Sequence, residues 1–226
     1  FVLRTGIHGH ALPREPCGPS STVYSYCRQW EAAGVFAEAW AAALAAYDAE
    51  QGGVDLAGSD GGMTNAPLGG EKDGAEPDRP WQVGDQAALH TEGGGIPSGR
   101  TGAGANRPAL TLLAATLSAT VIQRPPPTAA LPQHLCLDAG YDNAPSRQTI
   151  DEAGYIPHIR SRHDEQLANQ RNPGVQARRW VVERALSWIN RFRKVLICCE
   201  KLTPTHYALL CFACAYIALK RAALYE

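Results

Sequence analysis

The sequence predicts an α/β fold in which helices flank a mixed sheet and a small helical segment precedes it. A buried-strand pattern at residues 134–137 is followed by a short helix pattern at 145–152, with Asn143 as a candidate N-cap and Gly154 as its end, and by a second strand pattern at 155–159. Strands joined through a helix run parallel in one sheet. An amphipathic pattern over residues 176–198 adds a long helix, and glycine-rich sequence with weaker strand patterns comes before the strand–helix–strand unit.

Residues 1–50 are predicted to form the helical segment and residues 51–226 the main domain. Within the segment, apolar residues recur at helical spacing over residues 23–33 and 35–49, which one glycine separates. Two helices around a glycine turn can form a helix-turn-helix that reads DNA, or a hairpin that packs on the main domain. The hairpin is the favoured interpretation, because Arg28 is the only cation on the second half of the first helix.

Weaker patterns ahead of the strand–helix–strand unit predict the remaining strands and one helix. Residues 54–60 are predicted to form a strand that ends on Asp60, and residues 87–90 a second short strand. Apolar residues at helical spacing predict a helix over residues 109–122. The glycine run at residues 93–95 predicts a turn, since the residues around it match no phosphate-binding glycine motif.

Two acidic residues of the main domain occupy positions that suit a binding site. Asp138 directly follows the strand at 134–137, at the carboxyl edge where open sheets hold their ligands. Glu183 lies on the polar side of the helix predicted over 176–198. Taken singly, an aspartate after a strand is most often a turn former, and an exposed glutamate is most often a solvated partner of a nearby arginine. The functional interpretation therefore rests on their arrangement together with Asp60.

Charge is distributed unevenly along a chain whose net charge is almost zero. The formal net charge is −1, but residues 156–201 contain ten Lys or Arg against four Asp or Glu. The remaining residues contain eleven against eighteen. A local basic segment is what binding to a phosphate backbone requires, so an average near zero does not exclude a nucleic-acid partner.

Cysteine usage and hydropathy indicate a cytoplasmic protein without a membrane span. Seven cysteines at irregular spacing, with no secretory signal ahead of them, predict reduced thiols. Cys211 and Cys214 lie near His206, which is compatible with zinc, but buried thiols in an apolar helix are favoured because no second ligand pair is suitably spaced. The apolar run at residues 207–219 is shorter than the ~20 residues that a bilayer span needs.

Several blocks of sequence, in a fixed order, resemble the DDE-type transposases of bacterial insertion sequences. The blocks cover nearly the whole chain, and their order is far more specific than any one of them. They are Asp60-Gly61-Gly62-Met63-Thr64, residues 66–72, Thr91-Glu92-Gly93 with Gly95-Ile96-Pro97, Gly104-Ala105-Asn106-Arg107, residues 135–138 with Gly140-Tyr141-Asp142, residues 157–162, and residues 178–184 with Ser187-Trp188 and residues 190–193.

The resemblance implies a ribonuclease H-like sheet with flanking helices, and cut-and-join chemistry on the ends of a DNA element. It implies that Asp60, Asp138 and Glu183 are the catalytic acids and that they bind Mg²⁺, or Mn²⁺ in its place. The implied partner is double-stranded DNA with inverted-repeat ends, bound by a homo-oligomer. The cations expected to contact this DNA are Arg160, Arg162, Arg178, Arg179, Arg184, Arg191, Arg193 and Lys194.

The chemistry of phosphodiester transfer suits these residue types. A water or a 3′-hydroxyl must lose a proton, and the charge on the leaving oxygen and the phosphate must be neutralised. Two metal ions about 3.5–4 Å apart meet both needs, and carboxylates are hard oxygen ligands that let Mg²⁺ keep several waters. Asp60 and Asp138 are expected to fix the metals from strands, Glu183 to complete the second site from a helix, and Arg179 to orient Glu183 or a phosphate.

The chain departs from the family pattern at positions near the expected DNA path. The departures, most of which remove a cation or a hydrogen-bonding group, are Gly9-His10, Asn65, Gln86-Ala87, Pro108-Ala109 and Ala139. Each lost phosphate contact lowers DNA affinity and its dependence on salt. The chain also starts at Phe1 rather than at Met, so a truncated or decayed transposase is expected. The alternatives are a non-catalytic DNA-binding remnant and a stand-alone metal nuclease.

Overall fold

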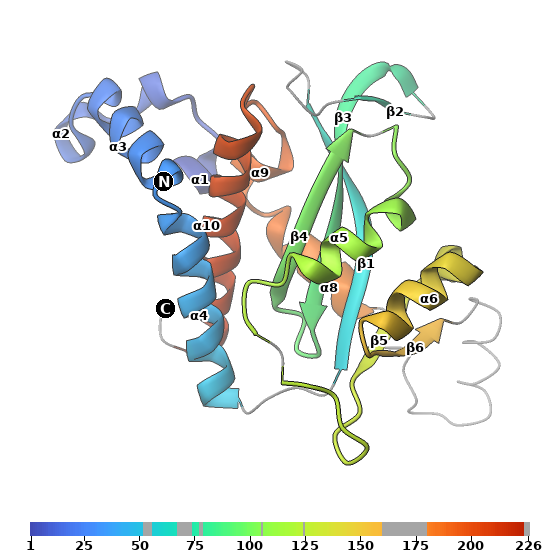
Figure 1. The fold of residues 1–226 in the computed structure, drawn as a ribbon. Coiled ribbons are helices and arrows are strands. Elements are labelled where there is room, and N and C mark those ends of the chain that lie inside the picture. Colours follow the sequence, from blue (N-terminus) through green and yellow to red (C-terminus); the bar gives the residue numbers. More distant parts are fainter. Residues whose placement is uncertain are drawn as a thin grey trace.

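The computed structural model describes residues 1–51, 56–66, 74–76, 79–104, 106–123, 125–159 and 180–223, and all structural statements below concern these residues. One mixed sheet lies between helices on both of its faces, with a helical pair beside it (Figure 1). The strands are β1 (Leu56–Asn65), β2 (Gly74–Glu76), β3 (Arg79–Glu92), β4 (Pro97–Gly104), β5 (His134–Leu137) and β6 (Ile156–Ile159).

The strand order is β2-β3-β1-β5-β6, and β4 also pairs with β3. β3 is antiparallel to both β1 and β4, whereas β1, β5 and β6 run parallel. An antiparallel meander therefore continues into a parallel pair on the other side of its first strand. This arrangement confirms the predicted parallel unit at 134–159 and the ribonuclease H-like mixed sheet with flanking helices.

The helices cover the two faces of the sheet and extend beyond it on one side. The α-helices are α1 (Val2–Thr5), α2 (Arg14–Cys17), α3 (Ser20–Ala32), α4 (Val35–Gln51), α5 (Leu113–Ser118), α6 (Ala144–Glu152), α8 (Trp180–Ile189), α9 (Arg193–Leu196) and α10 (Thr203–Arg221). The 3-10 helices are η1 (Gly9–Ala11), η2 (Ala109–Leu112) and η3 (Ala139–Tyr141). In the part of the chain described, no helix is both long and apolar enough to cross a bilayer.

Two glycines of β1 show which helices lie on which face. A Cβ placed on Gly58 would lie 2.5 Å from Cγ2 of Val182 in α8. A Cβ on Gly61 would lie 2.4 Å from the Cβ of Ala109 in η2. Because side chains alternate along a strand, even-numbered positions of β1 point toward α8 and odd-numbered ones toward η2 and α5. Asp60 is therefore on the α8 face.

Two buried clusters hold the layers together. The larger one joins α4 and α10 to α8 and the sheet, and its members include Trp40, Leu44, Leu89, Val182 and Leu210. The smaller one lies between β5 and helices α5 and α6, with members Leu113, Leu135, Leu137, Tyr141, Ile150 and Tyr155. In the larger cluster Trp40 is fully buried, and its Nε1 donates to the carbonyl oxygen of Pro97 at 2.9 Å. This bond satisfies the buried indole N–H and joins α4 to the first residue of β4.

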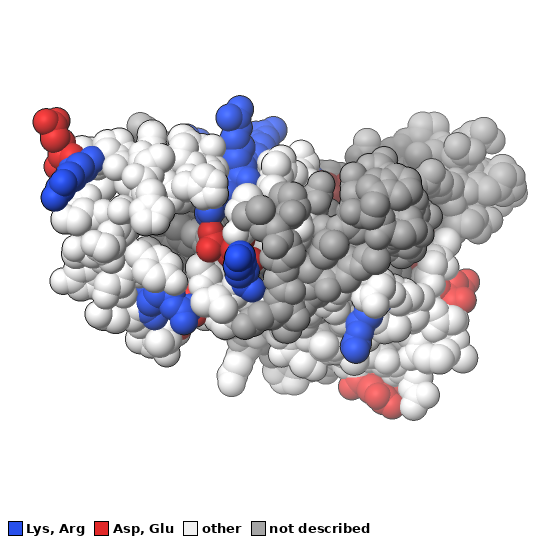
Figure 2. All heavy atoms as spheres, turned by 90° about the horizontal axis from the view of Figure 1, so that it is seen from above, with Lys and Arg blue, Asp and Glu red and all other residues white. Residues whose placement is uncertain are grey.

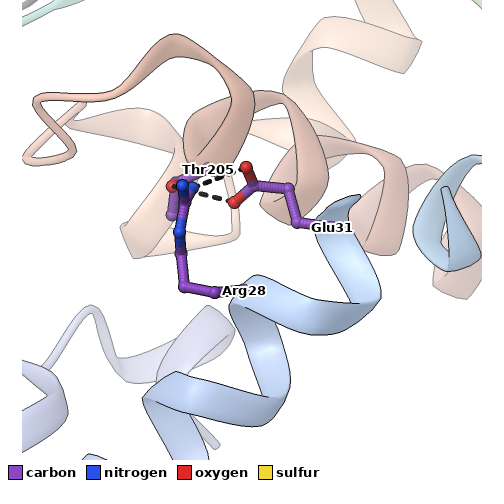
Figure 3. A network of polar contacts seen from close by, with 3 residues as sticks. All are labelled: Arg28, Glu31 and Thr205. Carbon is purple, nitrogen blue, oxygen red and sulfur yellow. Dashed lines mark hydrogen bonds and ion pairs between the residues drawn. The ribbon is translucent and has the colours of Figure 1, made fainter. Parts of the chain in front are cut away.

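The N-terminal helices pack on the rest of the fold. α4 lies along α10 over most of its length (Figure 1). Arg28 of α3 forms an ion pair with Glu31 at 2.6 Å and donates to the hydroxyl of Thr205 in α10 at 3.2 Å. That hydroxyl donates in turn to Glu31 at 3.0 Å, which closes the network (Figure 3). The cation that a DNA-reading helix would need is thus engaged with α10.

Three predicted elements differ from the observed ones in length. The strand predicted over residues 87–90 is part of β3, which runs from Arg79 to Glu92. The strand predicted to end at Asp60 continues to Asn65, because its backbone pairs with β3 along its whole length. The helix predicted over 109–122 ends at Ser118, because the following chain turns to pair with β4, where Val121 N–H donates to the Ser98 carbonyl oxygen at 2.9 Å. Pairing of this kind joins backbone groups of segments that are distant in the sequence, so the pattern of apolar residues does not show where it begins or ends.

The helix predicted over residues 176–198 is interrupted after Ile189. Phe192 takes an extended conformation, with φ −89° and ψ 98°, and a separate short helix, α9, follows. Its ring is buried and meets Tyr216 of α10 edge-on, with the centroids 5.7 Å apart. Burial of this aromatic ring favours the break over a continuous helix. α10 begins at Thr203, and Leu202 occupies its cap position.

Candidate metal and nucleic-acid site

Asp60 and Asp138 occupy neighbouring positions on parallel strands. β1 and β5 pair with Gly58 opposite Cys136, so two residues further along Asp60 comes level with Asp138, just past the end of β5. Neighbouring strands lie about 4.8 Å apart, and both aspartates are half-buried. One oxygen of each carboxylate accepts the next backbone N–H, from Gly61 at 2.7 Å and from Ala139 at 2.5 Å. The main-chain N–H groups therefore fix the direction of the two carboxylates.

Tyr141 gives a second indication that the two carboxylates lie close together. Its side chain is buried in the cluster between β5 and α6, three residues after Asp138. Burial raises the pKa of its phenol, and the negative charges of Asp60 and Asp138 raise it further. The phenol of Tyr141 therefore lies close enough to both carboxylates for their charges to act on its pKa. The sequence prediction did not single out this residue, although an aromatic residue three positions after the second acid was visible in the Gly140-Tyr141-Asp142 block.

Glu183 lies in the first turn of α8, on the helix that covers the same face of the sheet. Its predecessor Val182 is buried against Gly58, two residues before Asp60 on β1, while Glu183 itself is exposed. Within the described ranges no three His, Cys, Asp or Glu side chains gather closely enough to hold a metal ion. The structure therefore brings Asp60 and Asp138 together and places Glu183 over their face of the sheet, outside a closed triad.

The donor chemistry of the aspartate pair suits a hard divalent cation. Mg²⁺ is usually held by one or two carboxylates, with waters and substrate phosphates filling its other positions. Two carboxylates on adjacent strands, with their directions fixed by backbone N–H groups, provide such a partial ligand set. The pair fits Mg²⁺ or Mn²⁺ better than a softer metal, which prefers imidazole or thiolate ligands.

The predicted DNA-contacting cations fall into three groups. Arg160, Arg162, Arg178 and Arg179 lie outside the described residues. Arg191 and Arg193 are exposed at the junction of α8 and α9. Seen from above, several Lys and Arg side chains lie near the middle of the molecule with an acidic side chain beside them, and further acidic and basic side chains lie toward the two ends (Figure 2).

Lys194 and Arg184 form the third group, because their cationic ends are used inside the fold. The Lys194 side chain is almost fully buried, and its Nζ lies 2.6 Å from Oε1 of Glu200. Arg184 stacks on Trp180 and Trp188 and donates to the carbonyl oxygen of Gly94. Both residues were predicted as DNA contacts because sequence shows the charge of a side chain but not its direction.

The departures from the family pattern take up different environments. Ala139 and Pro108 are exposed, so each leaves a surface position without a cation. Gln86 and Ala87 are buried in β3. The side chain of Asn65 lies outside the description. The loss of positive charge at the surface is therefore clearest at Ala139, directly beside Asp138.

The cysteine pair of α10 is buried, as its apolar context predicts. Cys211 and Cys214 are both fully buried. Burial raises the pKa of Cys211 to about 11 and that of Cys214 still higher, so both thiols are protonated at neutral pH. A thiol must lose its proton to become a good metal ligand or nucleophile. The pair therefore serves packing.

Comparisons with known proteins agree with this arrangement. The transposase DDE domain family matches residues 135–220, a range that contains Asp138 and Glu183. A putative transposase for insertion sequence element IS402 from Burkholderia cepacia is 29% identical over 156 residues, which cover 66% of this chain and 69% of that protein. No solved structure matches the chain significantly. Together with the sheet order, these similarities support a DDE-type transposase of insertion sequences.

Proposed function

We propose that this chain cleaves DNA at the ends of an insertion sequence and joins the cut ends to a target, in a reaction that depends on divalent metal ions. The neighbouring position of Asp60 and Asp138 on β1 and β5 carries the proposal. Two carboxylates held level on adjacent strands favour metal binding, because a cation between them offsets the repulsion of their charges. The family match over residues 135–220 supports DNA as the substrate.

The three acids have separate roles in this proposal. Asp60 and Asp138 bind Mg²⁺ or Mn²⁺ from the rigid sheet, and Glu183 completes the ligand set from α8. The bound metal supplies activation of the attacking oxygen and neutralisation of the leaving one. The backbone N–H groups of Gly61 and Ala139 hold the two aspartates in place before metal or DNA arrives. Such preorganisation saves reorganisation during the reaction.

The exposed cations near α9 are proposed to hold the DNA backbone. Of the predicted DNA-contacting cations that the structure describes, Arg191 and Arg193 are the exposed ones. The four arginines outside the described residues are proposed to extend this contact. Binding of the two element ends by a homo-oligomer is part of the same proposal, because each end needs its own set of acids.

A DNA-binding remnant is the second candidate, and one observation favours it. Ala139 is exposed directly beside Asp138, where the family pattern has a lysine. A missing cation there weakens the hold on a phosphate close to the acids. In this alternative the chain occupies element ends without cutting them.

A nicking assay on DNA that carries the flanking inverted repeats separates the candidates. The wild-type chain is expected to nick this DNA at the 3′ end of the element in Mg²⁺ or Mn²⁺. Asp138→Asn is expected to abolish nicking and to retain DNA binding. The matched control is Asp142→Asn, since Asp142 is an exposed acid four residues away that pairs with Arg147 at 2.7 Å. Binding without cutting supports the remnant, and cutting of any DNA regardless of its ends supports a nuclease; either result overturns the transposase proposal.

A further inference from the structure

Arg184 lies directly after Glu183 and is held by aromatic rings on both sides along α8. Its guanidinium carbon is 4.4 Å from the centre of the Trp180 ring and 4.9 Å from that of Trp188. Positions 180, 184 and 188 are one turn apart, so the three side chains form one stripe of the helix. Arg221 of α10 lies over Trp188 as well, at 4.8 Å, and extends the stripe to the last helix.

The polar end of Arg184 reaches the turn between β3 and β4. It donates to the carbonyl oxygen of Gly94. The turn is itself fixed by Glu92, whose carboxylate accepts the N–H groups of Gly94 and Ile96, each at 2.7 Å. Burial raises the pKa of Glu92, and these two hydrogen bonds and the charge of Arg184 act against that rise.

The glycines of this turn allow the close approach. A Cβ on Gly94 would lie 2.4 Å from the hydroxyl oxygen of Tyr47. Gly95 has a φ of +82°, and a Cβ there would lie 3.0 Å from Nη2 of Arg184 and 3.1 Å from the carbonyl oxygen of Val181. Glycine at positions 94 and 95 is thus explained by contact with α4 and α8.

These contacts fix α8 to the sheet immediately before and after Glu183. Val182 packs on Gly58 of β1, and Arg184 binds the β3–β4 turn. Successive helical residues point about 100° apart. Two anchors in different directions, one residue either side of Glu183, therefore set both the rotation and the axial position of the helix at that residue.

We propose that Arg184 is a positioning residue that sets where α8 presents Glu183 relative to Asp60, and that it does not bind DNA. The inference rests on the proposed function, because it assumes that Glu183 is a metal ligand. Arginine suits the role since its planar group stacks on indoles while its N–H groups donate in the same plane. Lysine carries the same charge but has no planar group to stack on an indole.

The test measures Mn²⁺ binding to the purified chain by electron paramagnetic resonance, without DNA or turnover. Arg184→Lys and Arg184→Met are expected to raise the apparent Kd for Mn²⁺ about tenfold, as the loss of partners that orient metal ligands does. Gly95→Ala perturbs the same contact from the turn and is expected to act in the same direction. The control is Ile150→Val, a conservative core change in α6 within the other buried cluster.

Two further readouts, hydrogen exchange and the salt dependence of DNA binding, decide between outcomes. Hydrogen exchange is expected to speed up in α8 and the β3–β4 turn of the Arg184 variants, with the rest of the sheet protected as before. The salt dependence of DNA binding is expected to stay unchanged, so a slope reduced by about one would identify Arg184 as a phosphate contact and overturn the inference. Wild-type Mn²⁺ affinity in folded Arg184 and Gly95 variants would also overturn it.

The same titrations separate this inference from the proposed function. Asp60→Asn and Glu183→Gln are expected to lose Mn²⁺ binding outright. If both bind Mn²⁺ as the wild type does, the proposed metal centre is wrong. If both lose it while the Arg184 variants keep it, the metal centre stands and only the positioning role fails.

Discussion

Gly58→Ala probes the contact that holds α8 against the sheet. The new Cβ would lie 2.5 Å from Cγ2 of Val182 and 3.3 Å from Oγ1 of Thr91. Carbon atoms in contact are about 3.5–4.0 Å apart, so α8 has to move by about 1 Å or Val182 has to change its rotamer. Valine in a helix strongly prefers one rotamer. Overpacking of this kind lowers the free energy of unfolding by about 1–3 kcal/mol.

A second substitution makes the prediction sharper. Val182→Ala alone removes buried methyl groups and is expected to cost about 2 kcal/mol. In the double variant the alanine at 58 occupies part of the space that Val182 vacates. The double variant is therefore expected to be about 1–2 kcal/mol more stable than the sum of the two single effects allows. Gly140→Ala is the control, because a Cβ there meets no atom within 4 Å.

Urea unfolding followed by far-ultraviolet circular dichroism measures these free energies. The Gly140→Ala chain is expected to unfold within about 0.5 kcal/mol of the wild type. Strictly additive effects of the substitutions at 58 and 182 would show that the two side chains do not meet. A Gly58→Ala chain as stable as the wild type would show that Val182 of α8 does not pack closely on Gly58.

The remaining predictions concern the pH dependence of stability and the roles of two cations, one buried and one exposed. Burial lowers the pKa of His206 to about 3, with Arg100 and Lys194 adding to the effect, whereas unfolded histidine titrates near 6.5. The free energy of unfolding therefore keeps its full value above pH 6.5 and falls as the pH drops toward 3, by about 2 kcal/mol at pH 5, because the unfolded chain takes up a proton that the folded chain does not. His206→Gln should flatten this pH dependence, measured by urea unfolding. Parallel curves for the variant and the wild type would contradict the prediction. Lys194→Met is expected to lower stability by about 1–3 kcal/mol through the loss of its contact with Glu200, without changing the salt dependence of DNA binding. Arg191→Ala should instead lower that salt slope by about one and leave stability within about 0.5 kcal/mol, so the opposite pattern in fluorescence anisotropy would reverse the two assignments.

The parallel unit and the aspartate at its edge could be predicted from sequence because their signals are local. The buried run before Asp138, the Asn143 cap and the stop at Gly154 each lie within a few residues of the feature they determine. The structure bears them out: the Asn143 side chain accepts the Ser146 N–H at 2.9 Å, and Gly154 has a φ of +75°. Features that depend on residues nearby in the sequence are therefore the ones that sequence alone predicts well.

The features that sequence could not predict depend on partners far along the chain. The length of β1 is set by its pairing with β3, and the break at Phe192 by the ring of Tyr216. Arg184 and Lys194 differ from Arg191 only in the direction of their side chains, which Gly94 and Glu200 determine. Charge and periodicity carry no information about such contacts, so sequence alone does not separate exposed cations from buried ones.

The central claim is that Asp60, Asp138 and Glu183 bind divalent cations together. Crystals of the chain with element-end DNA, soaked in Mn²⁺ and measured at a wavelength where manganese scatters anomalously, test this most directly. We expect an anomalous peak in contact with the carboxylates of Asp60 and Asp138, with Glu183 drawn into the same site. Full occupancy of DNA with no manganese between the two aspartates, or with Glu183 turned away from it, would contradict the account.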